Sequence, residues 1–204
     1  MRRASFNTLN QFNTDNLLLG HFSLHLQLVQ GQNIAMDKHL KPAVMRIRPA
    51  RVSDAAGIAG VLNPIIRAGC YTIMREPVSL AGQVAFMRDF PARGVFLVAE
   101  DSRILGIQDV VPVADGVRSH VGEISTFVAL DALRQGIGRR LTEVMVKHTL
   151  ERGYTKLIAR IRGDNDKALA FYQNQGFRLI GSRKQVRLGG GFIDQVLAER
   201  LIAG

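Results

Sequence analysis

The chain has 204 residues, a length that favours a single domain. Hydrophobic residues make up 47% and charged residues 22%, the composition of an ordinary soluble globular protein. The single cysteine, Cys70, excludes an internal disulfide framework and a cysteine-rich zinc site.

No segment reads as a membrane span or a secretory signal. The longest apolar stretch, 17–29, is too short and too polar to cross a bilayer. Polar residues follow Met-Arg-Arg at the start, where a signal peptide would have an apolar core. We therefore expect a cytoplasmic protein with no membrane partner.

The net charge of +10 is concentrated in one segment. Residues 134–187 hold thirteen basic and four acidic residues, whereas residues 45–133 are neutral. Such a segment attracts an anion, either nucleic acid, a phosphorylated cofactor or an acidic lipid surface, or it is only a solvated basic face. Few aromatic residues interleave with the arginines and no nucleic-acid-binding motif is present, so nucleic acid is not the expected partner.

The first part of the chain differs in composition from the rest. Residues 5–16 are rich in Asn and Thr, and residues 1–44 read as a poorly structured leader, with at most one strand over 21–29. Patterned sequence begins near Met45, so the expected domain covers 45–204. No metal site is expected in the leader, because its histidines lack acidic partners: His21, His25 and His39.

The elements predicted from Val44 onward follow the order β-α-α-β-β-β-α-β-α-β-β. The predicted strands cover 44–49, 94–100, 104–113, 119–130, 156–161, 178–188 and 192–201. The predicted helices begin after Ser53 or Asp54, begin after Ser79, and cover 136–152 and 165–174. We expect Pro64 to kink or divide the first helix. This order predicts an α/β fold with a mixed sheet rather than a doubly wound one.

The most informative stretch is the strand–turn–helix passage that contains Gly136-Ile137-Gly138. Glycines at a helix start let a bulky anion approach the backbone, and the free N–H groups there bind phosphate. Arg134, Arg139 and Arg140 add positive charge. The alternative is that the glycines only serve packing. The pattern lacks the third glycine of a dinucleotide fingerprint and the lysine of a P-loop.

Two motifs resemble the GCN5-related N-acetyltransferase (GNAT) superfamily. Residues 133–138, Leu-Arg-Gln-Gly-Ile-Gly, are similar to its phosphate-binding motif Gln/Arg-x-x-Gly-x-Gly/Ala, although Leu133 departs from it. Residues 165–177 resemble its second motif, Asn-x-x-Ala-x-x-x-Tyr-x-x-x-Gly-Phe. The resemblance covers roughly 45–202. Within it, 75–79 and 191–194 are similar to the branch of phosphinothricin and methionine sulfoximine acetyltransferases.

The resemblance implies a mixed, mostly antiparallel sheet of about seven strands flanked by about four helices. It implies an enzyme, an acyl-CoA-dependent N-acyltransferase with acetyl-CoA as co-substrate and no metal. Acetyl would pass by direct attack to a primary amine of a small molecule, an amino acid or an analogue. Two alternatives stay open: a protein or charged tRNA as acceptor, and a non-catalytic module that binds CoA or another anion. A homodimer is compatible with this family.

The family also implies catalytic roles. An acceptor ammonium, with a pKa of roughly 10, must lose a proton before it attacks the thioester. Glu123, on the strand leading to the glycine turn, is the predicted base, directly or through water. The alternative for Glu123 is an exposed strand carboxylate. Tyr172 is predicted to protonate the leaving thiolate, and its alternative is a half-buried helix tyrosine.

Cofactor contacts follow from the same resemblance. The backbones of Phe127 and Val128 would pair with the pantetheine arm as an added strand does, and one N–H could polarise the thioester oxygen. Asn165 would contact the cofactor, although alone it reads equally as a helix N-cap. The residues predicted to hold the phosphates are Arg134, Gln135, Gly136, Ile137, Gly138 and Arg139.

Arg75 is the predicted substrate-binding residue. It lies in the segment 71–79, which in this superfamily helps to wall the acceptor pocket. A guanidinium binds a carboxylate through two parallel hydrogen bonds, so Arg75 would hold the carboxylate of an amino-acid acceptor. The alternative is a surface arginine paired with Glu76 or Glu100.

Overall fold

The computed structural model describes residues 44–114, 116–188 and 191–203. The predicted leader, 1–44, with its histidines and its one predicted strand, lies outside these residues except for Val44.

Seven strands and four α-helices occur in the described residues, as the sequence predicts. The strands are β1 (Arg46–Pro49), β2 (Val95–Glu100), β3 (Ile104–Pro112), β4 (Val121–Val128), β5 (Lys156–Arg162), β6 (Arg178–Leu188) and β7 (Gly191–Leu201). The helices are α1 (Ala55–Arg67), α2 (Leu80–Arg88), α3 (Ile137–Glu151) and α4 (Asp166–Asn174).

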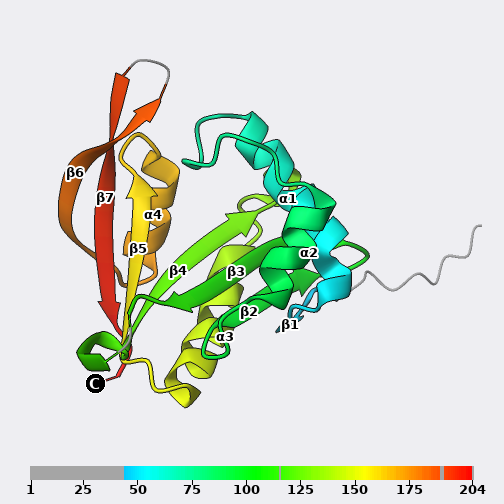
Figure 1. Cartoon of the computed structure of the whole chain (residues 1–204), viewed down its shortest axis with the longest axis horizontal. Coiled ribbons are helices and arrows are strands. Elements are labelled where there is room, and N and C mark those ends of the chain that lie inside the picture. The colour runs from blue at the N-terminus through cyan, green and yellow to red at the C-terminus, as the bar shows by residue number, and fades with distance from the viewer. Residues whose placement is uncertain (1–43, 115, 189–190, 204) are drawn as a thin grey trace, which may run out of the picture. The chain divides into compact units, whose positions relative to one another are not determined.

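The strands form one sheet in the order β1-β2-β3-β4-β5-β7-β6. Every neighbouring pair is antiparallel except β4 and β5, which are parallel. Figure 1 shows that β4 and β5 start together and then diverge, with α4 beside β5 and α1 on the far side of the opening. The predicted mixed, mostly antiparallel sheet is therefore confirmed.

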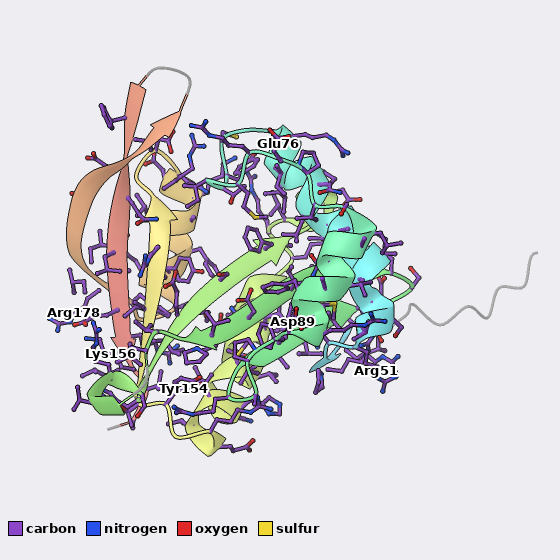
Figure 2. All side chains as sticks on the ribbon, in the orientation of Figure 1. Arg51, Glu76, Asp89, Tyr154, Lys156 and Arg178 are labelled. Carbon is purple, nitrogen blue, oxygen red and sulfur yellow. The ribbon has the colours of Figure 1, made fainter. Side chains whose placement is uncertain are left out.

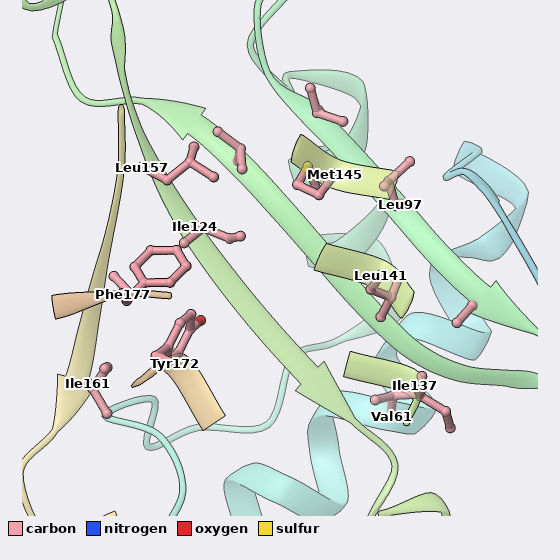
Figure 3. Packing of buried hydrophobic residues seen from close by; sticks show 14 of the residues in the cluster. Val61, Leu97, Ile124, Ile137, Leu141, Met145, Leu157, Ile161, Tyr172 and Phe177 are labelled. Atoms are coloured by element: carbon pink, nitrogen blue, oxygen red, sulfur yellow. The ribbon is translucent and has the colours of Figure 1, made fainter. Parts of the chain in front are cut away.

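Helices cover both faces of the sheet. Consecutive residues of β2 pack against helices on opposite faces. Leu97 is buried in a cluster with Leu141 and Met145 of α3, shown in Figure 3. The next residue, Val98, belongs to a second cluster with Ile58 of α1. Because successive strand residues point to opposite faces, α3 lies on one face and α1 on the other.

Of the two effects expected of Pro64, division of α1 is excluded, because the proline lies inside one continuous helix. The helix continues to Arg67, and the N–H of Ala68 bonds the carbonyl of Pro64 over 3.0 Å. A proline inside a helix costs about 3 kcal/mol. Ile65 and Ile66, just beyond it, are both buried, and each contributes about 1.5–3 kcal/mol, so packing outweighs the lost hydrogen bond.

The strand predicted over 119–130 is shorter in the structure. It covers Val121–Val128, and a single 3-10 turn, Leu130–Ala132, leads from it toward α3. The cap predicted for α2 is confirmed, since the Ser79 hydroxyl accepts a hydrogen bond from the N–H of Gly82 over 3.0 Å.

Candidate active site

The opening between β4 and β5 positions the site. The two strands pair only from Val121 to Glu123 on β4, opposite Lys156 to Ile158 on β5. Beyond Glu123 no strand in the described part of the chain pairs with this edge of β4, so its outward N–H and C=O groups face the opening visible in Figure 1. An unpaired strand edge of this kind can take an extended ligand as an added strand.

Two cavities lie along this opening. The helix-end cavity, of about 580 Å³, runs along the free part of β4 to the start of α3 and the adjacent face of α4. The carboxylate cavity, of about 650 Å³, lies between α1, α2 and the strands β3, β4 and β5. Both are lined by the same six residues where they meet: Tyr71, Thr126, Phe127, Asn165, Ala168 and Tyr172.

The geometry of the turn before α3 explains why glycine occupies positions 136 and 138. Gly136 precedes the helix with φ of 75°, a left-handed conformation that glycine adopts at little cost. Arg134 is also left-handed, with φ of 63°, which is costly for a side-chain-bearing residue and typical of ligand sites. At Gly138 a Cβ would lie 2.8 Å from Cε2 of Phe171, so this glycine serves packing between α3 and α4.

The start of α3 fits a phosphate group. No side chain caps the helix at Gly136, and the first intrahelical hydrogen bond comes from Arg140 N–H to the Gly136 carbonyl. The N–H groups of the three residues between them are therefore free of intrahelical partners. Arg134 and Arg139 line the same cavity, so backbone donors and two cations converge there.

Eight of the nine predicted cofactor residues line the helix-end cavity: Phe127, Val128, Arg134, Gly136, Ile137, Gly138, Arg139 and Asn165. The ninth, Gln135, is exposed and lies outside the lining. Arg140 does not line the cavity either, because its guanidinium donates to the Met45 carbonyl over 3.1 Å. The structure thus brings the predicted set together apart from Gln135.

The side chain of Asn165 is occupied within the protein. Its Oδ1 accepts from the N–H of Ala168, which caps α4 as the alternative reading expects. Its Nδ2 donates to the carbonyl of Tyr71 over 3.2 Å. Arg162 donates to the carbonyls of Gly69 and Thr72. These bonds hold the loop between α1 and α2 against the start of α4 and the end of β5.

The carboxylate cavity has apolar walls and two acidic groups. Glu123, the predicted base, lines it and forms an ion pair with Arg160 of β5, with Oε2 and Nε 3.2 Å apart. Its side chain is 28% exposed, so it is neither free in solvent nor buried. The second acidic group is Asp109 of β3.

Sequence reasoning missed Asp109. Burial, and next the negative charge of Glu123, raise the pKa of this carboxyl to about 7. The signal was present, since Asp109 interrupts an otherwise apolar run, Ile104–Val111, apart from Gln108. An acidic side chain inside such a strand needs a partner or a function.

Tyr172 lies where the two cavities meet. Its hydroxyl donates to Oγ1 of Thr126 over 3.1 Å, and its ring packs at right angles on Phe171 and Phe177, as Figure 3 shows for Phe177. The side chain is buried rather than half-buried, and burial raises the pKa of its hydroxyl well above the usual value. Tyr172 therefore holds its proton at neutral pH.

A buried polar chain connects Tyr172 to the start of α3. Gln108 donates through Nε2 to the hydroxyl oxygens of both Thr126 and Thr142, each over 2.9 Å. The Thr142 hydroxyl donates in turn to the carbonyl of Gly138. The chain fixes the Thr126 hydroxyl, and through it the position of the Tyr172 oxygen.

Arg75 is not brought to the site. It is exposed and lines neither cavity, although Ile73 and Met74 beside it line the carboxylate cavity. Figure 2 shows its neighbour Glu76 at the outer end of the loop between α1 and α2. Glu100, one of the two acidic partners considered for Arg75, pairs instead with Arg46 and Arg48.

Residues 44–203, apart from 115 and 189–190, contain neither a metal-binding cluster nor a membrane-spanning helix. No group of three or more His, Cys, Asp and Glu side chains there could hold a metal ion. No helix in the same part of the chain is long and apolar enough to cross a membrane.

Comparison with solved structures places the fold. A phosphinothricin acetyltransferase from Sinorhizobium meliloti in complex with AcCoA superposes with a TM-score of 0.71 at 21% identity, covering 78% of this chain and 89% of that one. A putative acetyltransferase from Salmonella typhimurium with its cofactor acetyl-CoA gives a TM-score of 0.70 at 19% identity, covering 78% and 94%.

Comparison with curated sequences gives a partial match. A mycothiol acetyltransferase from Catenulispora acidiphila is 35% identical over 95 residues, covering 43% of this chain and 29% of the relative. The match therefore spans less than a third of that relative's length.

The family model of the acetyltransferase (GNAT) family matches residues 67–177, more than half of the chain. The matched segment runs from the end of α1 through α4 and includes the unpaired edge of β4, the glycine turn and Tyr172. The chain belongs to the acetyltransferase (GNAT) family.

Proposed function

We propose that this protein transfers the acetyl group of acetyl-CoA to the primary amine of a small molecule. The observation that carries the proposal is the meeting of two unlike cavities at the free edge of β4. One ends at an uncapped helix start with two arginines, suited to phosphates. The other holds carboxylates between apolar walls, suited to an ammonium group on an organic body.

The residues present fit acetyl-CoA. The N–H groups at the start of α3, with Arg134 and Arg139, would hold the phosphates, and the backbone around Phe127 and Val128 would pair with the pantetheine arm. Bound there, acetyl-CoA supplies an activated acyl group as a thioester. The six residues shared by the cavities would surround the reacting atoms, with the neutral Tyr172 hydroxyl available to protonate the leaving sulfur.

An acceptor of small size agrees with the carboxylate cavity of about 650 Å³, which is in the range of small-molecule sites. An amino acid or a close analogue remains the expected acceptor class. Arg160, which lines the cavity, is better placed than the exposed Arg75 to bind an acceptor carboxylate. A protein or tRNA acceptor and a homodimer remain predictions from the sequence.

Binding of the co-substrate is tested by thermal unfolding. A ligand that binds only the folded state raises Tm, so millimolar acetyl-CoA should raise it by several degrees. Changing both Arg134 and Arg139 to Gln should remove most of that shift. The matched control is Arg103→Gln, an exposed arginine paired with Asp131 outside both cavities. No shift in the wild-type protein would contradict the cofactor assignment.

Transfer is tested by release of free thiol from acetyl-CoA. The acceptors to compare are α-amino acids, methionine sulfoximine, the corresponding decarboxylated amines, polyamines and lysine-containing peptides. Release with a small amine supports the proposal. Binding of acetyl-CoA without release on any acceptor, together with salt-dependent retention of DNA or RNA, would favour the non-catalytic alternative.

A further inference from the structure

The carboxylate cavity holds two acidic groups in an ordered arrangement. Asp109 of β3 is paired in register with Ser125 of β4 on one side and with Phe96 of β2 on the other. Glu123 is two residues from Ser125 along β4, so it points to the same face of the sheet. Asp109 and Glu123 are therefore diagonal neighbours, about 7–8 Å apart between backbone positions.

The two carboxylates differ in their partners. Glu123 has the guanidinium of Arg160 beside it. Asp109 receives neither a hydrogen bond nor an ion pair from any residue in the described part of the chain, and the surface of the cavity around it is mostly apolar. Its pKa of about 7 has burial as its main cause and the charge of Glu123 as its second. Asp109 therefore binds a proton more readily than an ordinary aspartate does.

The two carboxylates also differ in their distance from the point where the cavities meet. Asp109 lies opposite Ser125, two residues before Phe127, which lines both cavities. Glu123 is four residues before Phe127 on β4. At about 3.3 Å per strand residue, Glu123 is set back from the meeting point by two more residues, about 7 Å measured along the strand direction.

We propose that Asp109 is the group that takes the proton from the acceptor's ammonium, and that Glu123, held by Arg160, is a positioning residue that acts on Asp109 through its charge. This inference rests on the proposed function. It replaces the assignment of Glu123 as the base and leaves Tyr172 in its predicted role.

The proton balance follows from these assignments. The ammonium gives one proton to the Asp109 carboxylate, and the neutral nitrogen forms a bond to the thioester carbonyl carbon. The bond between that carbon and sulfur breaks, and the sulfur keeps its electron pair. The Tyr172 hydroxyl gives its proton to sulfur, and the second proton that the nitrogen loses returns to the Tyr172 oxygen. Asp109 then releases its proton to solvent.

The proton affinity of Asp109 suits this step. A carboxyl with a pKa of about 7 binds the proton of an amine roughly a thousandfold more strongly than one with the usual value of 3.8, and it is still ionised in half of the molecules at neutral pH. The other titratable or charged groups that face it across the cavity are Tyr71, Glu123, Arg160, Arg162 and Tyr172. Of these, Arg160 and Arg162 already have carboxylate partners, Glu123 and Asp164.

A direct test needs no acceptor. Carbon-13 NMR of aspartate-labelled full-length protein should show one carboxyl titrating near neutral pH that is absent in Asp109→Asn. In Glu123→Gln the same titration should move to lower pH, because a negative charge beside it has been removed. No such titration between pH 6 and 8, or a titration that Glu123→Gln leaves in place, would overturn the proposal.

The kinetic test uses the best amine from the thiol-release comparison. Asp109→Asn should lower kcat by about 10²–10⁴-fold. In the wild type, kcat/KM should rise with pH through about 7, and Glu123→Gln should shift that rise to lower pH with a smaller loss at the plateau. The matched control is Asp131→Asn, an exposed aspartate outside both cavities, which should change neither.

The outcomes separate this inference from the proposed function. In one outcome the wild type releases thiol, and the Asp109→Asn variant has a raised KM and an unchanged kcat. Asp109 would then only bind the ammonium, and only its assignment as proton acceptor would be overturned. A larger kcat loss in Glu123→Gln than in Asp109→Asn would also overturn it and would restore Glu123 as the base. Absence of release by the wild type with every amine would overturn the proposed function itself.

Discussion

The hydroxyl of Tyr172 donates a hydrogen bond to the Thr126 hydroxyl oxygen over 3.1 Å, and both residues line both cavities. Tyr172 comes from α4 and Thr126 from the unpaired part of β4, so this bond spans the opening between β4 and β5. It places a neutral, proton-bearing oxygen at the point where the acyl donor and the amine would meet.

Tyr172→Phe should lower kcat by about 10–100-fold and leave acetyl-CoA affinity nearly unchanged. The ring contacts with Phe171 and Phe177 remain, and Gln108 still donates to Thr126, so the Thr126 hydroxyl keeps a hydrogen-bond partner and Tm should change little. The measurement is thiol release beside a thermal melt. Tyr154→Phe is the control, because Tyr154 is also buried but donates to the Arg93 carbonyl outside both cavities. Full activity in Tyr172→Phe across pH would show that the hydroxyl does not protonate the sulfur.

The choice between two arginines can be decided by acceptor preference. If an acceptor carboxylate is bound by Arg160, Arg160→Ala should remove most of the preference for an α-amino acid over its decarboxylated amine, a loss of about 1.5–3 kcal/mol for a charged hydrogen bond. Arg75→Ala should leave the preference unchanged, because Arg75 lies outside the cavity. The preference is measured as the ratio of the kcat/KM values for the two acceptors. An effect of Arg160→Ala on Glu123 or Asp109 changes both values alike and cancels in this ratio. Loss of preference in Arg75→Ala alone would restore the prediction made from the sequence.

Acid stability should depend on Glu199 of β7, which pairs with Lys156 and Arg178. Figure 2 labels these two basic residues. Its hydrogen bond with Lys156 is the main cause that lowers its pKa below the usual 4.5. Since the folded state then binds the proton less tightly than the unfolded state, the stabilisation is present above pH of about 4.5 and is lost as pH falls through the lowered pKa. Glu199→Gln should lower Tm at pH 7 and flatten its fall in acid. A fall of Tm in acid that is the same in Glu199→Gln as in the wild type would contradict the prediction.

A chain that begins at Met45 should fold cooperatively and keep its kcat/KM. The sheet begins at Arg46, and every residue that lines either cavity lies between 62 and 195. The comparison is a thermal melt and thiol release beside the full-length protein. Loss of the cooperative melt would show that residues 1–44 contribute to the core.

Local features of the sequence were sufficient to predict the helices and strands and the residues that line the helix-end cavity. The apolar spacing of Ile58, Val61 and Leu62 determines which face of α1 is buried, because a helix repeats every 3.6 residues. The left-handed turn at Gly136 and the cap at Asn165 depend on φ angles and hydrogen bonds within a few residues. Such short-range requirements can be read from a single chain.

The arrangement of the charged groups in the carboxylate cavity depends on strand register, which no local pattern specifies. Asp109 and Glu123 are fourteen residues apart in the sequence and become neighbours only because β3 and β4 pair with Asp109 opposite Ser125. Arg160 reaches Glu123 through the parallel pairing of β4 and β5, whereas Arg75, in the expected segment, stays exposed. The sequence by itself determined the helices, the strands and the glycine turn before α3. Only the tertiary structure decided which charged groups line the carboxylate cavity, because strand pairing brings distant residues together and burial raises the pKa of Asp109.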